Sequence, residues 1–503
     1  MPKYLLGIDN GCTLSKAALY DLKGRCISVS SYKTKLIIPQ YGFIERDMVE
    51  LWNANVNVIK NIISESCIDP KEIVGISITG HGNGVYLVGE NGEPVYNGII
   101  STDSRAKDYI KKWYQDGTFE KVFPKTIQSI WAGQPVAILA WFKEHNPNIL
   151  KKIKWIFMCK DYIRYCLTGE AFAEITDISG TNLMNISDLK YDEELLQDFG
   201  LEDIICKLPP IRYSSDICGY VTKKAADLTG LEEGIPIAGG LFDIDACAIA
   251  TGVINTDKFC IVAGTWSINE FVTRKPIMSK DLFSNTIFCI PGYWLVLEGS
   301  PTSASNLEWF VTQFFGEENR LAKKKGVSIY TICDKMVLNI KPEDNDLIFM
   351  PFLFGSNVNV NARACFIGLN GLHTKANILR SVYEGIVFSH LYHIEKLLSF
   401  RDKPRSISIS GRASRSKAWV QIFADIIQIP IEVTCGTELG TLGAAICSGI
   451  ATGKFTSYSN AVQSMVRISY ICEPDIECMK IYKKKYQLYK KAIELLDPLW
   501  KEW

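Results

Sequence analysis

A strand–turn–strand pattern occurs twice in this chain, once at its start and once near its middle. Residues 4–20, YLLGIDNGCTLSKAALY, read as an apolar strand, a tight glycine turn and a second strand. Residues 259–272, FCIVAGTWSINEFV, have the same order, with the turn at Gly264 and Thr265. Each turn carries small and hydroxyl-bearing residues, so its backbone N–H groups can face an anion. The repeat predicts two halves of similar design, each opening with an anion-binding hairpin.

The chain is too long for a single hydrophobic core. At 503 residues it is expected to form two or three domains. β-branched strands such as IVGISITG (73–80) and SISISG (406–411) alternate with amphipathic helices, which predicts largely parallel sheets covered by helices. We therefore expect an α/β protein with domains over 1–250 and 251–503. The charged helical segments of about 100–235 lack clear strands and are expected to form an insertion in the first domain.

Charge and cysteine content argue against several classes of protein. The 55 Lys and Arg residues balance the 55 Asp and Glu residues, which argues against a nucleic-acid or anionic-membrane partner. We find no signal peptide and no apolar run of about 18 residues, so we expect no membrane span and a cytoplasmic location. The 16 cysteines are scattered without a CxxC pair, as in a reduced protein. His390 and His393 are expected on the surface and in the packing of a helix.

The first hairpin places a carboxylate beside its glycine turn. Asp9 ends an apolar strand and is followed directly by Asn10, Gly11 and Cys12. A carboxylate next to free N–H donors suits Mg²⁺ carried on a polyphosphate, because Mg²⁺ takes one or two carboxylates and keeps several waters. In the alternative interpretation, Asp9 and Asn10 only satisfy the backbone of their own turn. The segment by itself leaves both interpretations open.

A second carboxylate lies in an apolar, glycine-rich segment, IAGGLFDIDACAIATGV. Asp243 and Asp245 sit there among small and apolar residues, where a carboxylate is costly unless it has a role. Held at a domain junction, Asp243 would be a good general base for a hydroxyl. The alternative is that Asp243 caps the N-terminus of the following helix. Capping accounts for one of the two carboxylates but not for the apolar setting.

Polar side chains also follow the strand at 73–80. The stretch ITGHGNG presents His81 and Asn83, and STDSRA presents Asp103 and Arg105. A sugar has several hydroxyl groups, and each of them needs a donor or an acceptor. Such residues at strand ends suit a polyol pocket, although each taken singly also fits a satisfied surface residue.

Ordered motifs over the whole length resemble the FGGY family of carbohydrate kinases, in the superfamily of actin, hexokinase and heat-shock ATPases. The matching stretches include GIDNGCTLSKAALYD, ERDMVELW, GGLFDIDACAIATGV, VAGTWSINE, EGSPTSASNLEWF, MPFLFGSN and SGRASRSKAWVQ. GGLFDIDACA, AGTWSINE and SPTSASNLEWF are most similar to bacterial L-xylulose kinases. The resemblance implies two ribonuclease-H-like domains with ATP and sugar in an interdomain cleft. Homodimers are common in the family, so a homodimer is an open expectation.

The resemblance also implies roles for single residues. Asp9 matches the position that binds Mg²⁺ and phosphate, and Asp243 matches the catalytic base, which would also contact the substrate. His81, Asn83 and Asp103 fall on sugar-contacting positions. The implied nucleotide-binding residues are Asn10, Gly11, Thr13, Lys16, Gly264, Thr265, Gly411, Arg412 and Ala413.

The implied reaction is ATP-dependent, in-line phosphorylation of a hydroxyl of L-xylulose or a related pentulose. Three departures from the family pattern bear on it: Lys16 stands where many members have Arg, Arg412 stands where many have Gly, and GHGN replaces the Gln-Met-His of D-xylulose kinases. The last departure weighs against D-xylulose. Kinases of another ketose or polyol (D-xylulose, ribulose, erythritol, glycerol) stay as alternatives. More remote alternatives are an actin-like ATPase and a sugar-binding regulator.

Overall fold

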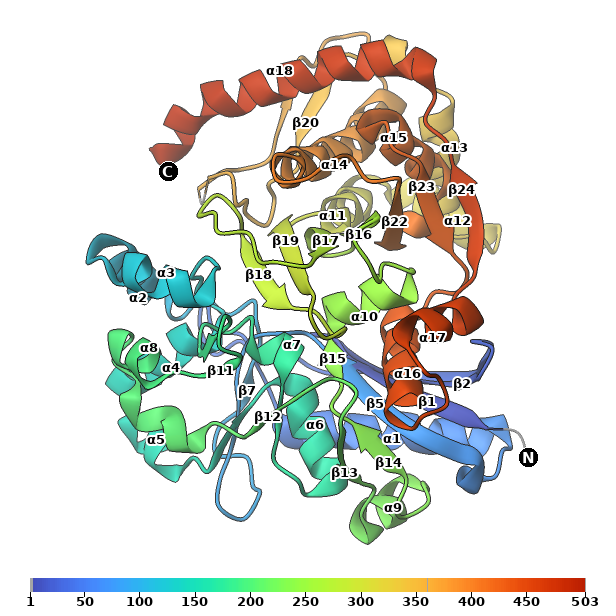
Figure 1. The fold of residues 1–503 in the computed structure, drawn as a ribbon. Helices are drawn as coiled ribbons and strands as arrows, with labels where there is room; N and C mark the ends of the chain where they lie inside the picture. The colour runs from blue at the N-terminus through green and yellow to red at the C-terminus, as the bar shows by residue number, and fades with distance from the viewer. Residues whose placement is uncertain (1–2, 360, 503) are drawn as a thin grey trace. The chain divides into compact units, whose positions relative to one another are not determined.

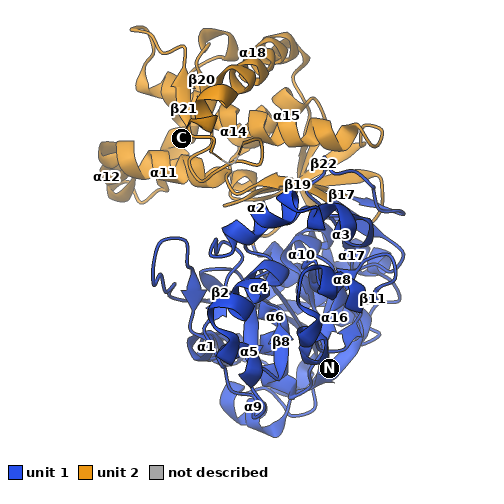
Figure 2. Ribbon diagram, turned by 90° about the vertical axis from the view of Figure 1, so that its left-hand side faces the viewer, with its two compact units in different colours: residues 1–254, 272–296, 438–466 blue, residues 255–271, 297–437, 467–503 orange. Residues whose placement is uncertain are grey.

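The computed structural model describes residues 3–359 and 361–502 of the chain. Its contacts group the chain into two compact units, coloured separately in Figure 2. The first unit comprises residues 1–254, 272–296 and 438–466, and the second comprises 255–271, 297–437 and 467–503. Two later segments thus return to the first unit. The division into domains at residue 250 therefore stays a prediction.

A mixed sheet forms the centre of the first unit. Its strands are, in spatial order, β13 (Ile217–Tyr220), β14 (Pro236–Ala238), β5 (Ile73–Gly80), β1 (Tyr4–Asn10), β2 (Leu14–Asp21) and β3 (Cys26–Lys33), and β15 (Leu241–Phe242) also pairs with β5. β1 and β2 are antiparallel, as the hairpin prediction requires, whereas β5 and β15 run parallel. β1 also runs parallel to β5. The carboxyl ends of β1, β5 and β15 therefore meet at one edge of the sheet.

Alternation along β1 decides what each face of the sheet contacts. Leu6 and Ile8 pack into an apolar core with α1 (Met48–Ser66) and α6 (Cys159–Thr168). Asp9 points to the opposite face, where it meets α16 (Leu439–Ala451). Figure 1 shows α16, in red, beside β1, in blue, although they lie more than four hundred residues apart in the sequence. The period of two in a strand thus separates core residues from site residues.

The region expected as an insertion has an apolar core of its own, formed by residues such as Trp113, Phe142 and Leu195. Its helices are α2 (Lys107–Gln115), α3 (Thr118–Thr126), α4 (Pro135–His145), α5 (Pro147–Lys152), α6, α7 (Ile175–Ile178), α8 (Glu193–Asp198) and α9 (Lys223–Thr229). Its short strands are β8 (Trp155–Phe157), β9 (Ala173–Glu174), β10 (Met184–Asn185), β11 (Lys190–Tyr191) and β12 (Ile211–Arg212). One difference from the expectation is β13, which joins the main sheet. It is too short for a period of two to be recognised.

The second unit also centres on a mixed sheet. Its strands are, in spatial order, β19 (Trp294–Ser300), β17 (Ser267–Thr273), β16 (Lys258–Ala263), β22 (Ser406–Gly411), β23 (Ile431–Thr434) and β24 (Ile468–Cys472). β16 and β17 form the second predicted hairpin, and β22 lies parallel to β16. Its helices are α11 (Ala304–Phe314), α12 (Gly316–Lys324), α13 (Ile329–Leu338), α14 (Lys375–Leu398), α15 (Lys417–Ile427) and α18 (Ile476–Lys501).

Shorter elements complete the two units. They are β4 (Glu45–Arg46), β6 (Tyr86–Val88), β7 (Gly98–Ile99), α10 (Asp243–Ala250), β18 (Ser284–Ile287) and α17 (Tyr458–Met465) in the first, and β20 (Ile348–Met350) and β21 (Cys365–Ile367) in the second. β4 pairs with β7, β6 with β8, and β20 with β21. The two-residue strand β4 and the start of α10 both carry residues of the candidate site.

Two helices of the second unit carry buried polar or aromatic side chains. α18 is amphipathic, with Tyr482, Tyr486 and Tyr489 buried on one face. On α14, His390 and His393 are both buried, which corrects the expected surface position. α14 is covered by α11, α13, α15 and β20, so that both histidines lie inside the unit. The two histidines there bond to serine hydroxyls instead of water.

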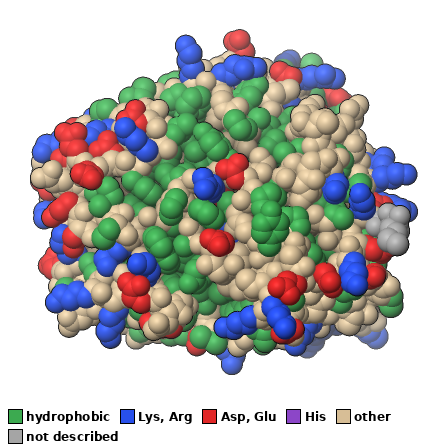
Figure 3. Space-filling model, turned by 60° about the horizontal axis from the view of Figure 1, so that its bottom comes forward, with side chains coloured by type: hydrophobic (Ala, Val, Ile, Leu, Met, Phe, Trp, Pro, Cys, Tyr) green, Lys and Arg blue, Asp and Glu red, His purple; other side chains and the backbone are tan. Residues whose placement is uncertain are grey.

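Three further features bear on the class of protein: the surface charges, the cysteines and the apolar character of the helices. On the face that Figure 3 shows, acidic and basic side chains are interspersed. All sixteen cysteines lack a disulfide partner. Within the described part of the chain, no helix has both the length and the apolar character needed to span a membrane.

Candidate active site

Asp9 lies at the carboxyl end of β1 with its side chain toward the start of α16. A Cβ atom on Gly440, the second residue of α16, would lie only 2.4 Å from Asp9 Oδ2, so a larger residue here would displace that carboxylate. Desolvation raises the pKa of Asp9 to about 6, with Lys16 opposing the change and Glu438 adding to it. A carboxylate held this way is stabilised by an added cation.

The chemistry at Asp9 fits Mg²⁺ bound largely through phosphate and water. Among the described residues, no group of three or more His, Cys, Asp or Glu side chains could hold a metal ion by itself. One or two carboxylates are what Mg²⁺ takes from a protein when its other ligands are phosphate oxygens and waters. The residues present therefore suit a metal that arrives with a polyphosphate.

The turn of the first hairpin leaves backbone donors open. Gly11 N–H donates to Leu14 O at 3.0 Å and closes the turn. The N–H groups of Cys12 and Thr13 have no hydrogen-bond partner in the described part of the chain. Thr13 is exposed, so this turn presents donors to the surface of the first unit. Two adjacent free N–H groups are suited to binding an anion.

Two other predicted nucleotide-binding residues of this hairpin already have partners. The amides of Asn10 and Asn55 exchange hydrogen bonds of 3.1 and 2.8 Å, and Ser15 also donates to Asn10 Oδ1 at 2.8 Å. The side chain of Asn10 thus ties β1 to α1. Lys16 Nζ lies 2.7 Å from Glu438 Oε2, so its charge is offset within the first unit.

Asp243 is the first residue of α10 and directly follows β15. The N-cap residue is Phe242, so Asp243 is the first residue inside the helix and not its N-cap, as the alternative interpretation supposed. Burial raises the pKa of Asp243 well above its usual range, and the negative charges of Asp9 and Asp177 raise it further. The first unit therefore brings Asp243 and Asp9 close enough to interact. A carboxyl group with a raised pKa is a stronger proton acceptor.

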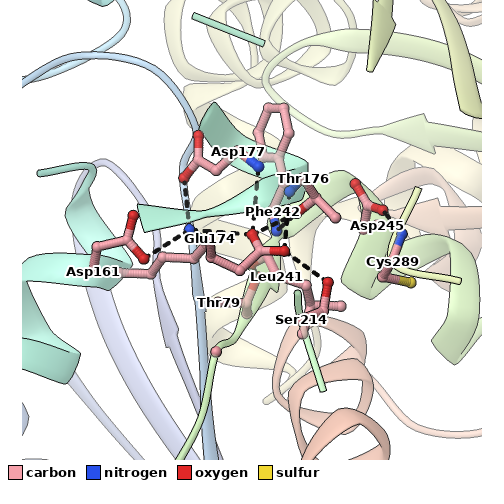
Figure 4. A network of polar contacts seen from close by, with 12 residues as sticks. Thr79, Asp161, Glu174, Thr176, Asp177, Ser214, Leu241, Phe242, Asp245 and Cys289 are labelled. Carbon is pink, nitrogen blue, oxygen red and sulfur yellow. Dashed lines mark hydrogen bonds and ion pairs between the residues drawn. The ribbon is translucent and has the colours of Figure 1, made fainter. Parts of the chain in front are cut away.

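A chain of buried hydrogen bonds holds the residue before Asp243 (Figure 4). Phe242 N–H donates to Thr176 Oγ1 at 2.9 Å, and the Thr176 hydroxyl donates to Glu174 at 2.7 Å. Ser214 donates to the other oxygen of Glu174 at 2.7 Å. The position of Asp243 is thereby fixed through the backbone of its neighbour.

A buried lysine connects this chain to the predicted sugar-binding loop. Lys160 Nζ lies 3.1 Å from Asp161, 3.3 Å from Glu174 and 3.3 Å from Asp177. Asp177 in turn accepts the N–H of Asn83 at 3.3 Å. Burial raises the pKa of Asp177 to about 7, with Lys160 opposing the change. One network therefore supports both the loop after β5 and the start of α10.

The three predicted sugar-contacting residues differ in whether their polar atoms already have hydrogen-bond partners. The His81 ring bonds to Tyr86 Oη at 2.8 Å, and burial lowers the pKa of His81 to about 3, which keeps it neutral. Both carboxylate oxygens of Asp103 accept hydrogen bonds from Arg105. Asn83 Oδ1 is buried and has no hydrogen-bond partner in the described structure. Of the three, Asn83 alone combines a buried position with an open acceptor.

The second hairpin is held by the start of α11. Gly264 O accepts the N–H of Ala304 at 2.9 Å, and Thr265 O accepts the hydroxyl of Ser305 at 3.1 Å. Thr265 is exposed. Both predicted residues of this turn are therefore anchored through their carbonyl groups.

The glycine-rich segment after β22 lies against the second hairpin. Gly411 has a φ of 84°, and a Cβ there would lie 2.6 Å from Ala263 O, so that a side chain is excluded twice. Arg412 forms an ion pair with Glu308 of α11. Ala413 is buried. Within the second unit, the segment 411–413 and the turn at 264–265 are thus neighbours.

The sequence analysis missed three residues that the structure places around the site. Lys160, Asp177 and Arg46 are all buried. The available signal was the presence of charged residues in apolar stretches, as in FMCKDYI and ITDISG, which is costly unless the charges are paired. Their partners lie far away in the sequence, so a single chain does not reveal the pairing.

Comparisons with known proteins show to which family the chain belongs. The model of the FGGY family of carbohydrate kinases matches with its N-terminal domain over residues 4–250 and with its C-terminal domain over 259–452. The chain is 38% identical over 497 residues to a probable L-xylulose kinase of Pasteurella multocida, covering 99% of each. It is 35% identical over 499 residues to the L-xylulose/3-keto-L-gulonate kinase of Escherichia coli, covering 99% of this chain and 98% of the relative.

A solved structure shares the fold. The ligand-bound xylulose kinase of Lactobacillus acidophilus superposes with a TM-score of 0.91 at 23% identity, with 99% of each chain covered. This likeness confirms the predicted class, two α/β domains of the ribonuclease-H-like type. Two family models span most of the chain, and relatives above 30% identity cover it almost entirely. The chain belongs to the FGGY family of carbohydrate kinases.

Proposed function

We propose that this carbohydrate kinase transfers the γ-phosphoryl group of ATP to a hydroxyl of L-xylulose or a related pentulose, with Asp243 as general base. The observation that carries the proposal is that Asp243 and Asp9 lie within electrostatic reach of each other in the first unit. Burial and the charge of Asp9 raise the pKa of Asp243 well above its usual range. A base beside a candidate metal carboxylate is what phosphoryl transfer to an alcohol requires.

In the proposed step, Asp243 accepts the proton of the attacking hydroxyl. The hydroxyl oxygen forms a bond to the γ-phosphorus as the bond from that phosphorus to the β–γ bridging oxygen breaks, and ADP leaves. The chain of hydrogen bonds through Phe242, Thr176 and Glu174 holds Asp243 in place. The free N–H groups of Cys12 and Thr13 would stabilise charge on the phosphoryl oxygens.

We assign Mg²⁺ to Asp9, directly or through water. When bound, the ion would neutralise charge on the β- and γ-phosphates. Lys16 is the alternative cation of this hairpin, but its partner Glu438 offsets its charge. The protein then contributes mainly position and electrostatics.

L-xylulose as acceptor is supported by three relatives above 30% identity, all of which are named for it. The Escherichia coli relative is also named for a keto-sugar acid, so a sugar acid belongs with the alternative acceptors. Asn83 Oδ1 has no hydrogen-bond partner in the described structure, so it could accept a hydrogen bond from a hydroxyl group of the sugar. We also propose a cytoplasmic location, because cysteines scattered without a CxxC pair are typical of a reduced protein.

ADP release with and without acceptors tests the reaction class. The panel contains L-xylulose, D-xylulose, ribulose, erythritol, glycerol and 3-keto-L-gulonate. We expect L-xylulose to give the highest kcat/KM. ATP hydrolysis that no acceptor stimulates would favour an actin-like ATPase, and binding of sugar without turnover would favour a regulator.

The role of Asp243 is tested by Asp243→Asn, which keeps the shape and removes the base. We expect kcat to fall by at least about 10²–10⁴, the usual contribution of a general base. Melting temperature serves as the control, because the fold should persist. Near-normal turnover in this variant would remove Asp243 from the role.

A further inference from the structure

Arg46 is a buried arginine without a carboxylate partner. It lies in β4, and its exposed fraction is 1%. None of the described Asp or Glu residues forms an ion pair with it. The two acids that flank it in sequence are engaged elsewhere: Glu45 pairs with Arg105, and Asp47 caps α1. A buried charge without a counter-charge is costly, so its presence calls for a function.

The remaining neighbours of Arg46 do not supply a negative charge near neutral pH. Besides the neutral His81, they are Tyr86, Cys159 and Cys12, whose polar groups interact with the guanidinium. Burial raises the pKa of Cys12 to about 12 and that of Cys159 to about 11, and it raises the pKa of Tyr86 well above its usual range. All three are therefore neutral, and the charge of Arg46 is left for another anion.

The guanidinium holds the turn of the first hairpin at both ends. Arg46 Nη1 donates to Gly11 O at 3.1 Å, and Nη2 donates to Thr34 Oγ1 at 2.5 Å. Thr34 N–H donates to Thr13 O at 3.1 Å, which extends the contact to the far end of the turn. Arg46 and Thr34 thus fix the segment that carries the two open N–H groups.

The hydrogen bond from Arg46 to Gly11 O also affects the N–H of Cys12, which belongs to the same peptide unit. In a trans peptide, the carbonyl of Gly11 and the N–H of Cys12 point in opposite directions. A cation on the carbonyl polarises the unit and strengthens the N–H as a donor. That N–H is free in the described structure, as is the N–H of Thr13. The positive charge of Arg46 therefore reaches an anion through the turn, without touching it.

We propose that Arg46 is a positioning residue for the terminal phosphates of ATP at the first hairpin, and that it supplies there the positive charge that the sequence pattern assigns to Lys16. The inference rests on the proposed function, in that ATP is the anion. Lys16 is offset by Glu438 at 2.7 Å, whereas Arg46 has no such partner among the described residues. Arg46 acts through the Gly11–Cys12 peptide and through the geometry of the turn.

A charge series at position 46 tests the inference on the full-length enzyme. Arg46→Lys keeps the charge, Arg46→Gln keeps a donor for Gly11 O without the charge, and Arg46→Met removes both. We measure Kd for Mg-ATP and for AMP, and kcat/KM at saturating acceptor. We expect Arg46→Gln and Arg46→Met to weaken Mg-ATP binding about tenfold and to lower kcat/KM by about 10–100-fold. AMP binding should change less than about twofold, because AMP lacks the terminal phosphates.

Matched variants separate charge from packing. Arg46→Lys should recover most of the Mg-ATP affinity, and Thr34→Val, which removes one hydrogen bond but no charge, should have a smaller effect than Arg46→Gln. Lys16→Met should also weaken Mg-ATP binding less than Arg46→Met does. Arg25→Met, at an exposed arginine paired with Asp21, controls for general loss of charge.

Several results would overturn the inference. They are equal weakening of AMP and Mg-ATP, a larger effect of Lys16→Met than of Arg46→Met, or an Arg46→Lys variant as weak as Arg46→Gln. If Arg46→Met does not fold, the comparison of the Lys and Gln variants still decides between charge and packing. A wild-type enzyme that fails to bind ATP at all would instead refute the proposed function.

Discussion

The two hairpins have the same backbone plan but different charges. Two residues before the turn glycine, the first hairpin has Asp9, and the second has Val262. In the first hairpin, four residues lie between the last paired positions, Asn10 and Ser15. In the second hairpin, three residues lie between Ala263 and Ser267. Only the first turn therefore combines open N–H groups with a carboxylate. A sequence echo of this kind indicates a shared backbone and does not imply shared chemistry.

The support of the two turns differs in the same way. The carbonyl of Gly11 accepts a hydrogen bond from the guanidinium of Arg46, whereas the carbonyl of Gly264 accepts one from the first N–H of α11, at Ala304. A helix N-terminus carries a partial positive charge, so both glycine carbonyls face a positive group. One hairpin obtains it from a side chain and the other from a helix dipole. Equivalent backbone positions are thus stabilised by unrelated means in the two hairpins.

The largest effect on kcat should come from removing the carboxylate that distinguishes the first hairpin from the second. Asp9→Asn removes the carboxylate of the first hairpin and should lower kcat by about 10²–10³, since it removes the candidate Mg²⁺ ligand. Val262→Thr alters the matching position of the second hairpin and should change kcat by less than about threefold. Steady-state kinetics at several Mg²⁺ concentrations provides the measurement. Equal losses of kcat in the two variants would contradict the view that only the first hairpin carries a catalytic carboxylate.

A smaller effect should follow from adding a methyl group beside each hairpin. A Cβ atom added to Gly264 would meet nothing within 4 Å, whereas one added to Gly440 or Gly411 would meet atoms at 2.4 and 2.6 Å. Gly440→Ala should displace the carboxylate of Asp9 and lower kcat about 10–100-fold. Gly411→Ala should lower the melting temperature by several degrees, because φ is also positive there. Gly264→Ala should leave the melting temperature nearly unchanged, and a large loss of stability in that variant would contradict the geometry.

The smallest effect concerns how buried groups of the two units respond to pH. Burial raises the pKa of Asp177 from 3.8 to about 7, so its contribution to stability is greatest below pH 4 and is lost as pH rises toward 7. Burial lowers the pKa of His390 from 6.5 to about 3, so its contribution is present above pH 6.5 and is lost as pH falls toward 3.

Melting temperatures of Asp177→Asn and His390→Gln between pH 4 and pH 8 check these opposite signs. Relative to wild type, Asp177→Asn should gain a few degrees as pH rises, and His390→Gln should gain a few degrees as pH falls. Each variant is compared with its own value at the other end of the range, which removes the constant cost of the lost hydrogen bonds. Parallel pH profiles of variant and wild type would contradict the assigned pKa shifts.

Much of the fold and part of the candidate site could be predicted from the sequence. Both hairpins are confirmed by β1–β2 and β16–β17, because glycine turns between alternating strands are local signals. The predictions for Asp9, Asp243 and Asn83 stay predictions, and the geometry around them supports them. The surface position expected for His390 was wrong, because burial of a helix on several sides leaves no simple pattern in its own sequence.

By itself, the sequence determined the α/β class, the two glycine turns and the strand ends at which carboxylates appear, because hydrophobic period and turn chemistry are written in neighbouring residues. Only the tertiary structure decided which charges remain uncompensated. Lys16 is neutralised by a residue more than four hundred positions away, whereas Arg46 is buried between two acids that are engaged elsewhere. Electrostatic energy depends on distance in space and on burial, and neither can be read from positions along the chain.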